Sequence, residues 1–105
     1  MDKLLEIIKA MGIPFAYDHF AEGEAVDPPF ICYLLSESDN FAADGKVYFK
    51  ANEVHIELYT DTKDLSVEQK VEAVLDEHGI YYDRSEVWIE SEKLYEVLYT
   101  FEMEA

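Results

Sequence analysis

The C-terminal segment alternates between apolar and polar side chains, and this pattern constrains the fold more than any other. Every second residue is aromatic or aliphatic: Tyr95, Val97, Tyr99, Phe101 and Met103. The positions between them include Glu96, Thr100 and Glu102. Successive side chains of a β-strand point to opposite faces of the sheet. The segment therefore predicts a strand with one face covered by another part of the chain.

Two amphipathic helices are predicted to supply that cover. Residues 2–11 repeat apolar side chains at helical spacing, and Gly12 follows where a helix commonly ends. A second apolar stripe consists of Val67, Val71, Val74 and Leu75. It begins after a capping box formed by Ser66 and Gln69, with Ser66 as the N-cap, and it ends at Gly79.

Four further segments have the composition of strands. They are residues 15–20, 30–35, 46–60 and 87–89. Asn52 and Glu53 shift the alternation within the third segment and predict a bulge or bend there. Polar residues 21–28 and 36–45 are predicted loops, the second closed by Asp44 and a following glycine. Residues 1–105 are thus predicted to form a single α+β domain in the order α-β-β-β-α-β-β, one antiparallel-rich sheet of about five strands with two helices packed against it.

The charge of the chain is strongly negative, since 24 Asp and Glu outnumber 8 Lys and Arg and give a formal net charge of −16. Binding to nucleic acid depends on Lys and Arg that neutralise phosphates, so a sequence-reading nucleic-acid binder is not expected. No apolar run approaches the length of a membrane span, and residues 1–6 lack the basic region of a signal peptide. Cys32 is the only cysteine, so no disulfide framework is expected. We expect the chain to fold in the cytoplasm.

The motifs that carry catalysis or metal binding are incomplete. His55 and Glu57 match the first half of a zinc deaminase signature, but the pair of cysteines that completes it is missing. The segment that starts at Glu37 resembles a calcium loop, yet Phe41 and Tyr48 occupy two of the positions that need oxygen ligands. The sequence therefore predicts a protein that is not an enzyme and has no catalytic residues, no cofactor and no metal.

Aromatic side chains are the remaining candidates for function. Tyrosine is common in protein interfaces because it combines apolar area with a polar tip. Phe41 lies in the long polar loop 36–45 and is the candidate anchor of a partner contact. The candidate interaction residues are Asp39, Asn40, Phe41, Asp44, Tyr48 and Tyr59. Two plainer readings stay open: the tyrosines are scattered surface residues, or Phe41 folds back onto its own loop.

Several short strings resemble the tail-completion, or minor tail, proteins of prophages and long-tailed phages of Gram-positive bacteria. They are Gly12–Tyr17, Pro28–Ile31, Ser38–Phe41 with Ala43–Gly45, Glu57–Asp61 and Glu90–Val97. The resemblance implies a structural protein that forms a ring, commonly sixfold, at the end of the tail tube. Such a ring terminates the tube and joins it to the head, and DNA passes through it without specific binding.

The same resemblance implies the partners and the location of the protein. The partners are further copies of itself, the tail tube protein and the head–tail connector protein. The location is the virion tail or neck, with the bacterial cytoplasm before assembly. The chain is expected to be a monomer when alone and to assemble on the tube. The alternatives are a small acidic interaction or DNA-mimic protein encoded by a prophage, whose carboxylates would form a phosphate-like row, and a small enzyme with a pocket of perturbed groups.

Overall fold

The computed structural model describes residues 2–21, 23, 25–37, 41–43, 46–49 and 51–104. It contains two helices, α1 (Asp2–Ala10) and α2 (Leu65–Glu77). The strands are β1 (Phe15–Tyr17), β2 (Phe30–Glu37), β3 (Phe41–Ala43), β4 (Lys46–Phe49), β5 (Ala51–Thr60), β6 (Asp83–Ile89) and β7 (Leu94–Glu104). Five strands form one sheet in the order β1-β2-β5-β7-β6, and β3 pairs with β4 in a separate hairpin.

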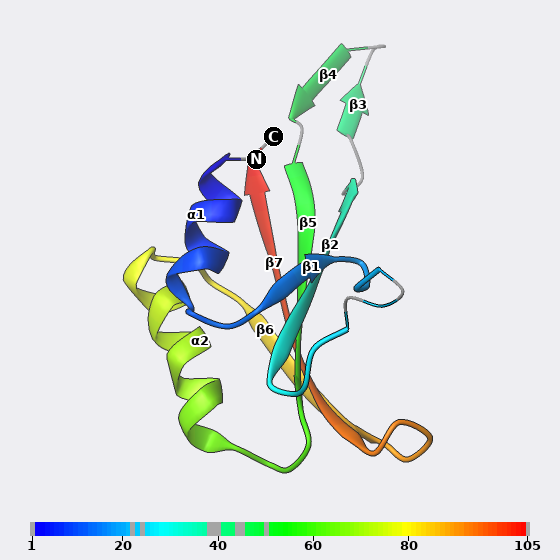
Figure 1. The fold of residues 1–105 in the computed structure, drawn as a ribbon. Coiled ribbons are helices and arrows are strands. Elements are labelled where there is room, and N and C mark those ends of the chain that lie inside the picture. The colour runs from blue at the N-terminus through cyan, green and yellow to red at the C-terminus, as the bar shows by residue number, and fades with distance from the viewer. Residues whose placement is uncertain are drawn as a thin grey trace.

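The predicted fold class is confirmed. The two helices and the five strands of the main sheet follow one another in the predicted order α-β-β-β-α-β-β, and the β3–β4 hairpin is inserted between the second and third of these strands. The sheet is mostly antiparallel, because only β1 runs parallel to its neighbour β2. Figure 1 shows both helices on the same side of the sheet.

The hydrophobic core lies between the two helices and the side of the sheet on which they pack, which we call the covered face. The alternation of the C-terminal strand is confirmed, since Val97, Tyr99 and Phe101 are buried and Met103 packs against them. The core residues of the other elements include Leu4, Ile7, Ile8, Ile31, Val54, Ile56, Leu58, Val71 and Leu75. Burying an aliphatic side chain of this size contributes roughly 1.5–3 kcal/mol, so the covered face supplies most of the hydrophobic stabilisation.

The start of the second helix differs from the prediction. The N-cap is Asp64, whereas Ser66 lies within the first turn. The Asp64 carboxylate accepts hydrogen bonds from the backbone N–H groups of Ser66 and Val67, at 3.1 and 3.3 Å, and from the Ser66 hydroxyl at 2.7 Å. Hydrogen bonds from Ser66 and Val67 lower the pKa of Asp64. Aspartate caps a helix as well as serine does, and here it stands two residues earlier.

The region between β2 and β5 also differs from the prediction. Residues 36–45 were expected to form a loop, but β2 continues to Glu37 and residues 41–43 form β3. The predicted stretch 46–60 is divided, because β4 pairs locally with β3 whereas β5 joins the main sheet. The predicted bulge at Asn52 and Glu53 is wrong, since both residues pair in register with β2 and β7. A local hairpin partner therefore explains the change in alternation.

Candidate interaction surface

Of the predicted interaction residues that the structure describes, Tyr59 lies far along the chain's sheet from Phe41 and Tyr48. Asp39, Asn40 and Asp44 lie outside the described residues. Phe41 begins β3 and Tyr48 lies in β4, in the hairpin that extends beyond the main sheet in Figure 1. Tyr59 lies near the opposite end of β5, and a ten-residue strand is about 33 Å long.

Tyr59 belongs to the open face, which we define as the side of the main sheet that carries no helix. The pairing aligns Phe30 of β2, Tyr59 of β5 and Glu96 of β7 in one row across this face. The next row aligns Cys32, Glu57 and Leu98. The chain between β1 and β2 lies on this same side (Figure 1). The open face therefore combines aromatic, apolar and acidic side chains from segments that are far apart in the sequence.

Three aromatic rings form a continuous wall on the open face. The rings of Phe30 and Tyr59 are stacked, with centroids 5.1 Å apart and an interplanar angle of 26°. Phe20, from the connection between β1 and β2, meets Phe30 edge to face at 5.4 Å and 87°. Such pairs contribute roughly 0.5–1.5 kcal/mol beyond the area that they bury. The wall therefore holds the connection against the sheet.

A cavity of about 490 Å³ adjoins this aromatic wall. Phe20, Phe30 and Tyr59 line it, together with Cys32 of β2 and Leu94 of β7. The remaining lining residues include the acids Asp18 and Glu92, which are both exposed to solvent. The cavity thus lies between the β1–β2 connection and the turn between β6 and β7, with aromatic walls and carboxylates near solvent.

The hydroxyl of Tyr59 lies between two carboxylates. Its oxygen is 2.9 Å from Oε1 of Glu57 and 2.8 Å from Oε2 of Glu96. A phenol has one hydrogen and can donate it to only one of these oxygens at a time. All three side chains are half-buried. One carboxylate therefore faces the hydroxyl oxygen without a hydrogen bond unless that carboxylate is itself protonated.

The pKa values of this group reflect that arrangement. Burial raises the pKa of Glu57, and the negative charge of Glu96 adds to the rise, while the hydrogen bond from Tyr59 opposes it. Burial also raises the pKa of Tyr59, as do its hydrogen bonds to both carboxylates. The hydroxyl therefore stays protonated at neutral pH. The single hydrogen of the Tyr59 hydroxyl therefore serves two carboxylates.

Cys32 is buried, and it lies on the open side of the sheet. Only 5% of the residue is exposed. Burial, followed by the charges of Glu57 and Asp18, raises the pKa of the Cys32 thiol to about 11. The thiolate is the nucleophilic form of cysteine, so a thiol that remains protonated at neutral pH is a poor nucleophile.

A second group of tyrosine and carboxylates lies on the covered side of the sheet. Tyr99 donates to Oε2 of Glu72 at 2.8 Å, and Nε of Arg84 lies 3.3 Å from the same oxygen. Glu68 of α2, only 3% exposed, contacts the Arg84 guanidinium and also Nζ of Lys63 at 2.9 Å. These contacts join α2 to β6 and to the segment that precedes the helix. The sequence did not predict a buried acid, because Glu68 lies beside the apolar stripe of a helix that is otherwise acidic on its surface.

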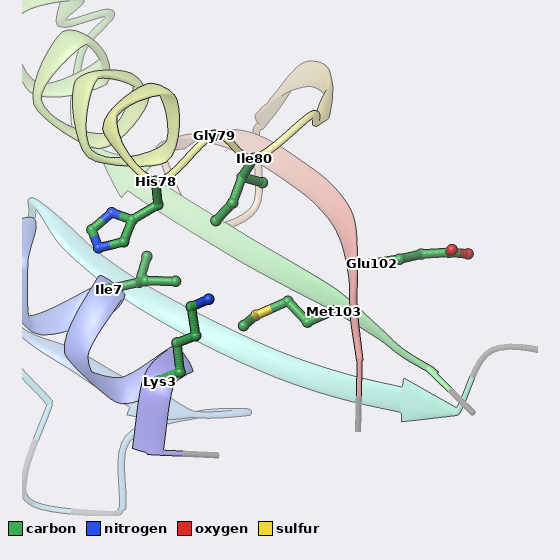
Figure 2. A pocket seen from close by; sticks show the side chains of 7 residues that line it. All are labelled: Lys3, Ile7, His78, Gly79, Ile80, Glu102 and Met103. Carbon is green, nitrogen blue, oxygen red and sulfur yellow. The ribbon is translucent and has the colours of Figure 1, made fainter. Parts of the chain in front are cut away.

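A second cavity, of about 500 Å³, lies between α1, the end of α2 and β7. Its lining residues are Lys3, Ile7, His78, Gly79, Ile80, Glu102 and Met103. Figure 2 shows Glu102 pointing away from it, while the ring of His78 lies beside Ile7. Nδ1 of His78 lies 2.9 Å from the carbonyl oxygen of Val74, so the histidine caps the last turn of α2. The negative end of the helix dipole makes this an unfavourable place for an anion.

The two outer strands of the main sheet expose their edges. β6 pairs with β7 on one side, and no other described strand pairs with it. Its residues are largely exposed, including the apolar side chains of Val87 (51%) and Trp88 (41%). β1, at the other edge, is only three residues long. Free strand edges carry unpaired N–H and C=O groups that can pair with another strand.

Among the described residues, no group of three His, Cys, Asp or Glu side chains is placed to hold a metal ion. No helix in the described part of the chain combines the length and the apolar character needed to span a membrane. No protein-family model matches the sequence, and no curated protein is significantly similar to it.

Tyr59 is one of the predicted interaction residues, but its neighbours Glu57 and Glu96 are not. Alternation along β5 places Glu57 and Tyr59 on one face, which was a usable signal. The contact between Tyr59 and Glu96 depends on the pairing of β5 with β7, and the two residues are 37 positions apart. A pattern of alternation predicts the face of a strand, but it carries no information about the strand that lies beside it.

Proposed function

We propose that the chain is a structural protein of the tail end or head–tail joint of a long-tailed phage, where copies of it form a ring that terminates the tail tube and joins it to the head. The sequence strings that resemble tail-completion proteins support this proposal. The observation that carries it is the relation between the two free edges of the sheet, β1 and β6.

The two free edges run in opposite directions. β1 and β2 are parallel, and each of the three following pairs in the sheet is antiparallel. β1 and β6 are therefore antiparallel to each other. A second copy placed beside the first in the same orientation would bring its β1 next to β6 as an antiparallel pair. A head-to-tail contact of this kind repeats from copy to copy and closes into a ring if the rotation per copy divides a full turn.

Each such contact would be small, because β1 offers only three residues. Sixteen excess negative charges on each copy also oppose association, most strongly at low salt, where screening extends over roughly 30 Å at 0.01 M. The chain alone is therefore expected to be a monomer. A tail tube that holds several copies at high local concentration would favour the ring, and the tube and connector proteins are the proposed partners. The acidic surface would let DNA pass without binding it.

The direct test is deletion of the gene in a phage or prophage that carries it. The expected particles have tails of uncontrolled length or tails not joined to heads, seen by negative-stain electron microscopy. Normal tails joined to heads after deletion would contradict the proposal and would favour the second candidate, an acidic interaction or DNA-mimic protein.

Two variants separate the edge contact from the rest of the proposal. Val87→Lys places a charge on the β6 edge, and Tyr81→Lys makes the same kind of change at a residue that is 89% exposed outside any strand. Both are expected to fold with unchanged thermal stability. Only Val87→Lys is expected to abolish the ring on the tail tube; equal behaviour of the two variants would exclude the β6 edge as the contact.

The β3–β4 hairpin is the proposed docking element towards the head. Phe41→Asp is expected to leave the melting temperature unchanged and to give overlong or headless tails. The hairpin is separate from the main sheet, so a change there is not expected to disturb the core. Normal particles from this variant would assign docking to another part of the chain.

A further inference from the structure

Exposed apolar side chains are concentrated on the two free edges of the sheet. The large apolar side chains that are exposed among the described residues are Tyr17, Val26, Leu65, Tyr81, Val87 and Trp88. Tyr17 lies on β1, and Val87 and Trp88 lie on β6. β6 contains no proline and pairs with β7 without a register shift, and its charged Arg84 and Glu86 are engaged in ion pairs within the same chain. The devices that commonly protect a strand edge are therefore weak on β6.

The exposed aromatic rings of the two edges lie on the same face of the sheet. Tyr17 aligns with Tyr33 of β2, and Trp88 aligns with Tyr95 of β7, both on the covered face. Each ring meets its neighbouring tyrosine at a steep angle, with centroids 5.2 Å apart at 85° for Tyr17 and 5.6 Å apart at 62° for Trp88. A second copy in the same orientation would therefore bring the aromatic edge of its β1 towards Trp88.

We propose that β1 of one copy pairs with β6 of the next copy in one defined register. The opposed residues are Phe15 with Trp88, Ala16 with Val87, and Tyr17 with Glu86. Opposed residues of an antiparallel pair lie on the same face, so a register must match covered face with covered face. Only two registers do this while all three residues of β1 stay opposite β6, and they differ by a shift of two residues.

Side-chain chemistry favours the first of these two registers. It covers the exposed ring of Trp88 with Phe15 and leaves Tyr17 within diagonal reach of the same ring. On the open face it places the small Ala16 opposite Val87, which is half-exposed. The shifted register would place Phe15 opposite the carboxylate of Glu86 and would leave Val87 and Trp88 uncovered.

The backbone of β1 is suited to an outward contact. The carbonyl oxygen of Pro14 and the N–H group of Asp18 each form a hydrogen bond of 2.8 Å with β2. In a parallel pair of strands, alternate residues bond to the same neighbour. The N–H groups of Phe15 and Tyr17 therefore point towards the free edge, where a strand of another copy would supply acceptors.

Pairing in this register would continue the main sheet from copy to copy. Because the covered faces stay on one side, α1 and α2 of every copy would lie on that side, and the open faces would form the other. This arrangement of a whole ring rests on the proposed function, whereas the register between two copies does not.

The test is disulfide trapping between copies of the purified protein. Ala16→Cys with Val87→Cys places two thiols opposite each other in the proposed register, where Cα atoms about 4.5–5.5 Å apart suit a disulfide. The control combines Ala16→Cys with Ser85→Cys, which is equally exposed and lies on the same face two residues away. Both variants also carry Cys32→Ala, because Cys32 aligns with residue 16 in the same chain. The engineered thiols of one chain lie four strand spacings apart, about 19 Å, so a disulfide between them joins two copies.

Both variants are concentrated at high salt, which screens the repulsion between copies, and are oxidised with glutathione disulfide. The expected result is about fivefold more cross-linked product from the Val87 variant than from the Ser85 variant on non-reducing gels. More product from the Ser85 variant would overturn the register, and equal amounts would show random collision and overturn the contact. Deletion of the gene tests the tail role separately, so failure of the register and failure of the proposed function give different results.

The fluorescence of Trp88, the only tryptophan, tests the contact without introduced cysteines. Covering its ring with Phe15 is expected to shift the emission to shorter wavelength as the protein concentration rises at high salt. Tyr17→Ser is expected to weaken this shift, whereas Tyr81→Ser, at an exposed residue outside the strands, is expected to leave it unchanged. Emission that is independent of concentration, or an equal effect of the two substitutions, would contradict the proposed contact.

Discussion

The two faces of the main sheet use the same chemical groups to different effect. β7 contributes Tyr99 to the covered face and Glu96 to the open face, and on both faces a tyrosine hydroxyl contacts a glutamate. On the covered face, Arg84 and Lys63 neutralise the acids and join α2 to the sheet. On the open face, the acids share one hydroxyl hydrogen. One group of charges is therefore paired within the described fold, whereas the other has more hydrogen-bond acceptors than donors.

The largest difference between the faces is expected in the hydrophobic core. Ile56→Ala removes a fully buried side chain between β5 and the helices and is expected to lower the free energy of unfolding by about 3–4 kcal/mol. His55→Ala, the neighbouring residue on the open side of the same strand, is expected to lower it by less than about 1 kcal/mol. Urea denaturation followed by circular dichroism measures both. Similar losses would show that the open face contributes to the core.

The next largest effect is expected from the charges of the covered face. Arg84→Met leaves Glu68 buried with Lys63 as its remaining cation, and the expected loss is about 3 kcal/mol. Lys93→Met removes the cation of an exposed pair with Glu90 and is expected to cost less than about 1 kcal/mol.

A double variant tests whether this loss of stability comes from the buried carboxylate of Glu68. Replacing Glu68 by Met in addition to Arg84→Met removes the buried carboxylate that has lost its guanidinium partner and is expected to recover most of the lost stability. Denaturation curves of the single and double variants give the coupling between the two residues. A double variant that is less stable than Arg84→Met alone would show that Glu68 acts through Lys63 and not through the guanidinium.

The smallest expected effect is the pH dependence of the open face. The pKa of Glu57 is raised in the folded protein, so its contribution to stability is present below the unfolded pKa and is lost as pH rises through the folded value. Glu57→Gln removes the carboxyl group, so the variant does not lose stability in this way as pH rises. The stability of the variant relative to the natural chain should therefore be greater at pH 7 than at pH 4.

Thermal melting at the two pH values checks this difference. Glu77→Gln, on the exposed side of α2, removes the same charge and reports the general effect of net charge. If Glu57→Gln and Glu77→Gln shift the melting temperature equally at both pH values, the burial of Glu57 has no effect on its protonation.

Sequence patterns predicted the covered face well because that face is built from periodicities. The alternation around Tyr99 and the stripe around Val71 both report burial against a hydrophobic core. The hairpin of β3 and β4 was missed because its two strands are short and pair only with each other. Such strands show no extended alternation of apolar and polar residues. Ser66 was predicted as the N-cap, but the N-cap is Asp64. Serine and aspartate can both accept hydrogen bonds from the free N–H groups at the start of a helix, so the sequence did not distinguish them.

The open face was harder to predict because it depends on contacts between distant segments. Phe20, Phe30 and Tyr59 come from three separate parts of the chain. The pairing of β2 with β5 places Phe30 beside Tyr59, and the β1–β2 connection adds the ring of Phe20. The burial of Glu68 was missed for a related reason. An acidic residue beside an apolar stripe is normally solvated, and its actual surroundings depend on Arg84, which lies 16 residues further along the chain.

The most direct test of the excess of acceptors on the open face is the titration of the Glu57 and Glu96 carboxyl carbons by ¹³C nuclear magnetic resonance. We expect the pKa of Glu57 to be raised above its ordinary value, because Glu57 is half-buried beside Glu96 and the two share the single hydrogen of Tyr59. An ordinary pKa for Glu57 would contradict this arrangement of the two carboxylates and the hydroxyl.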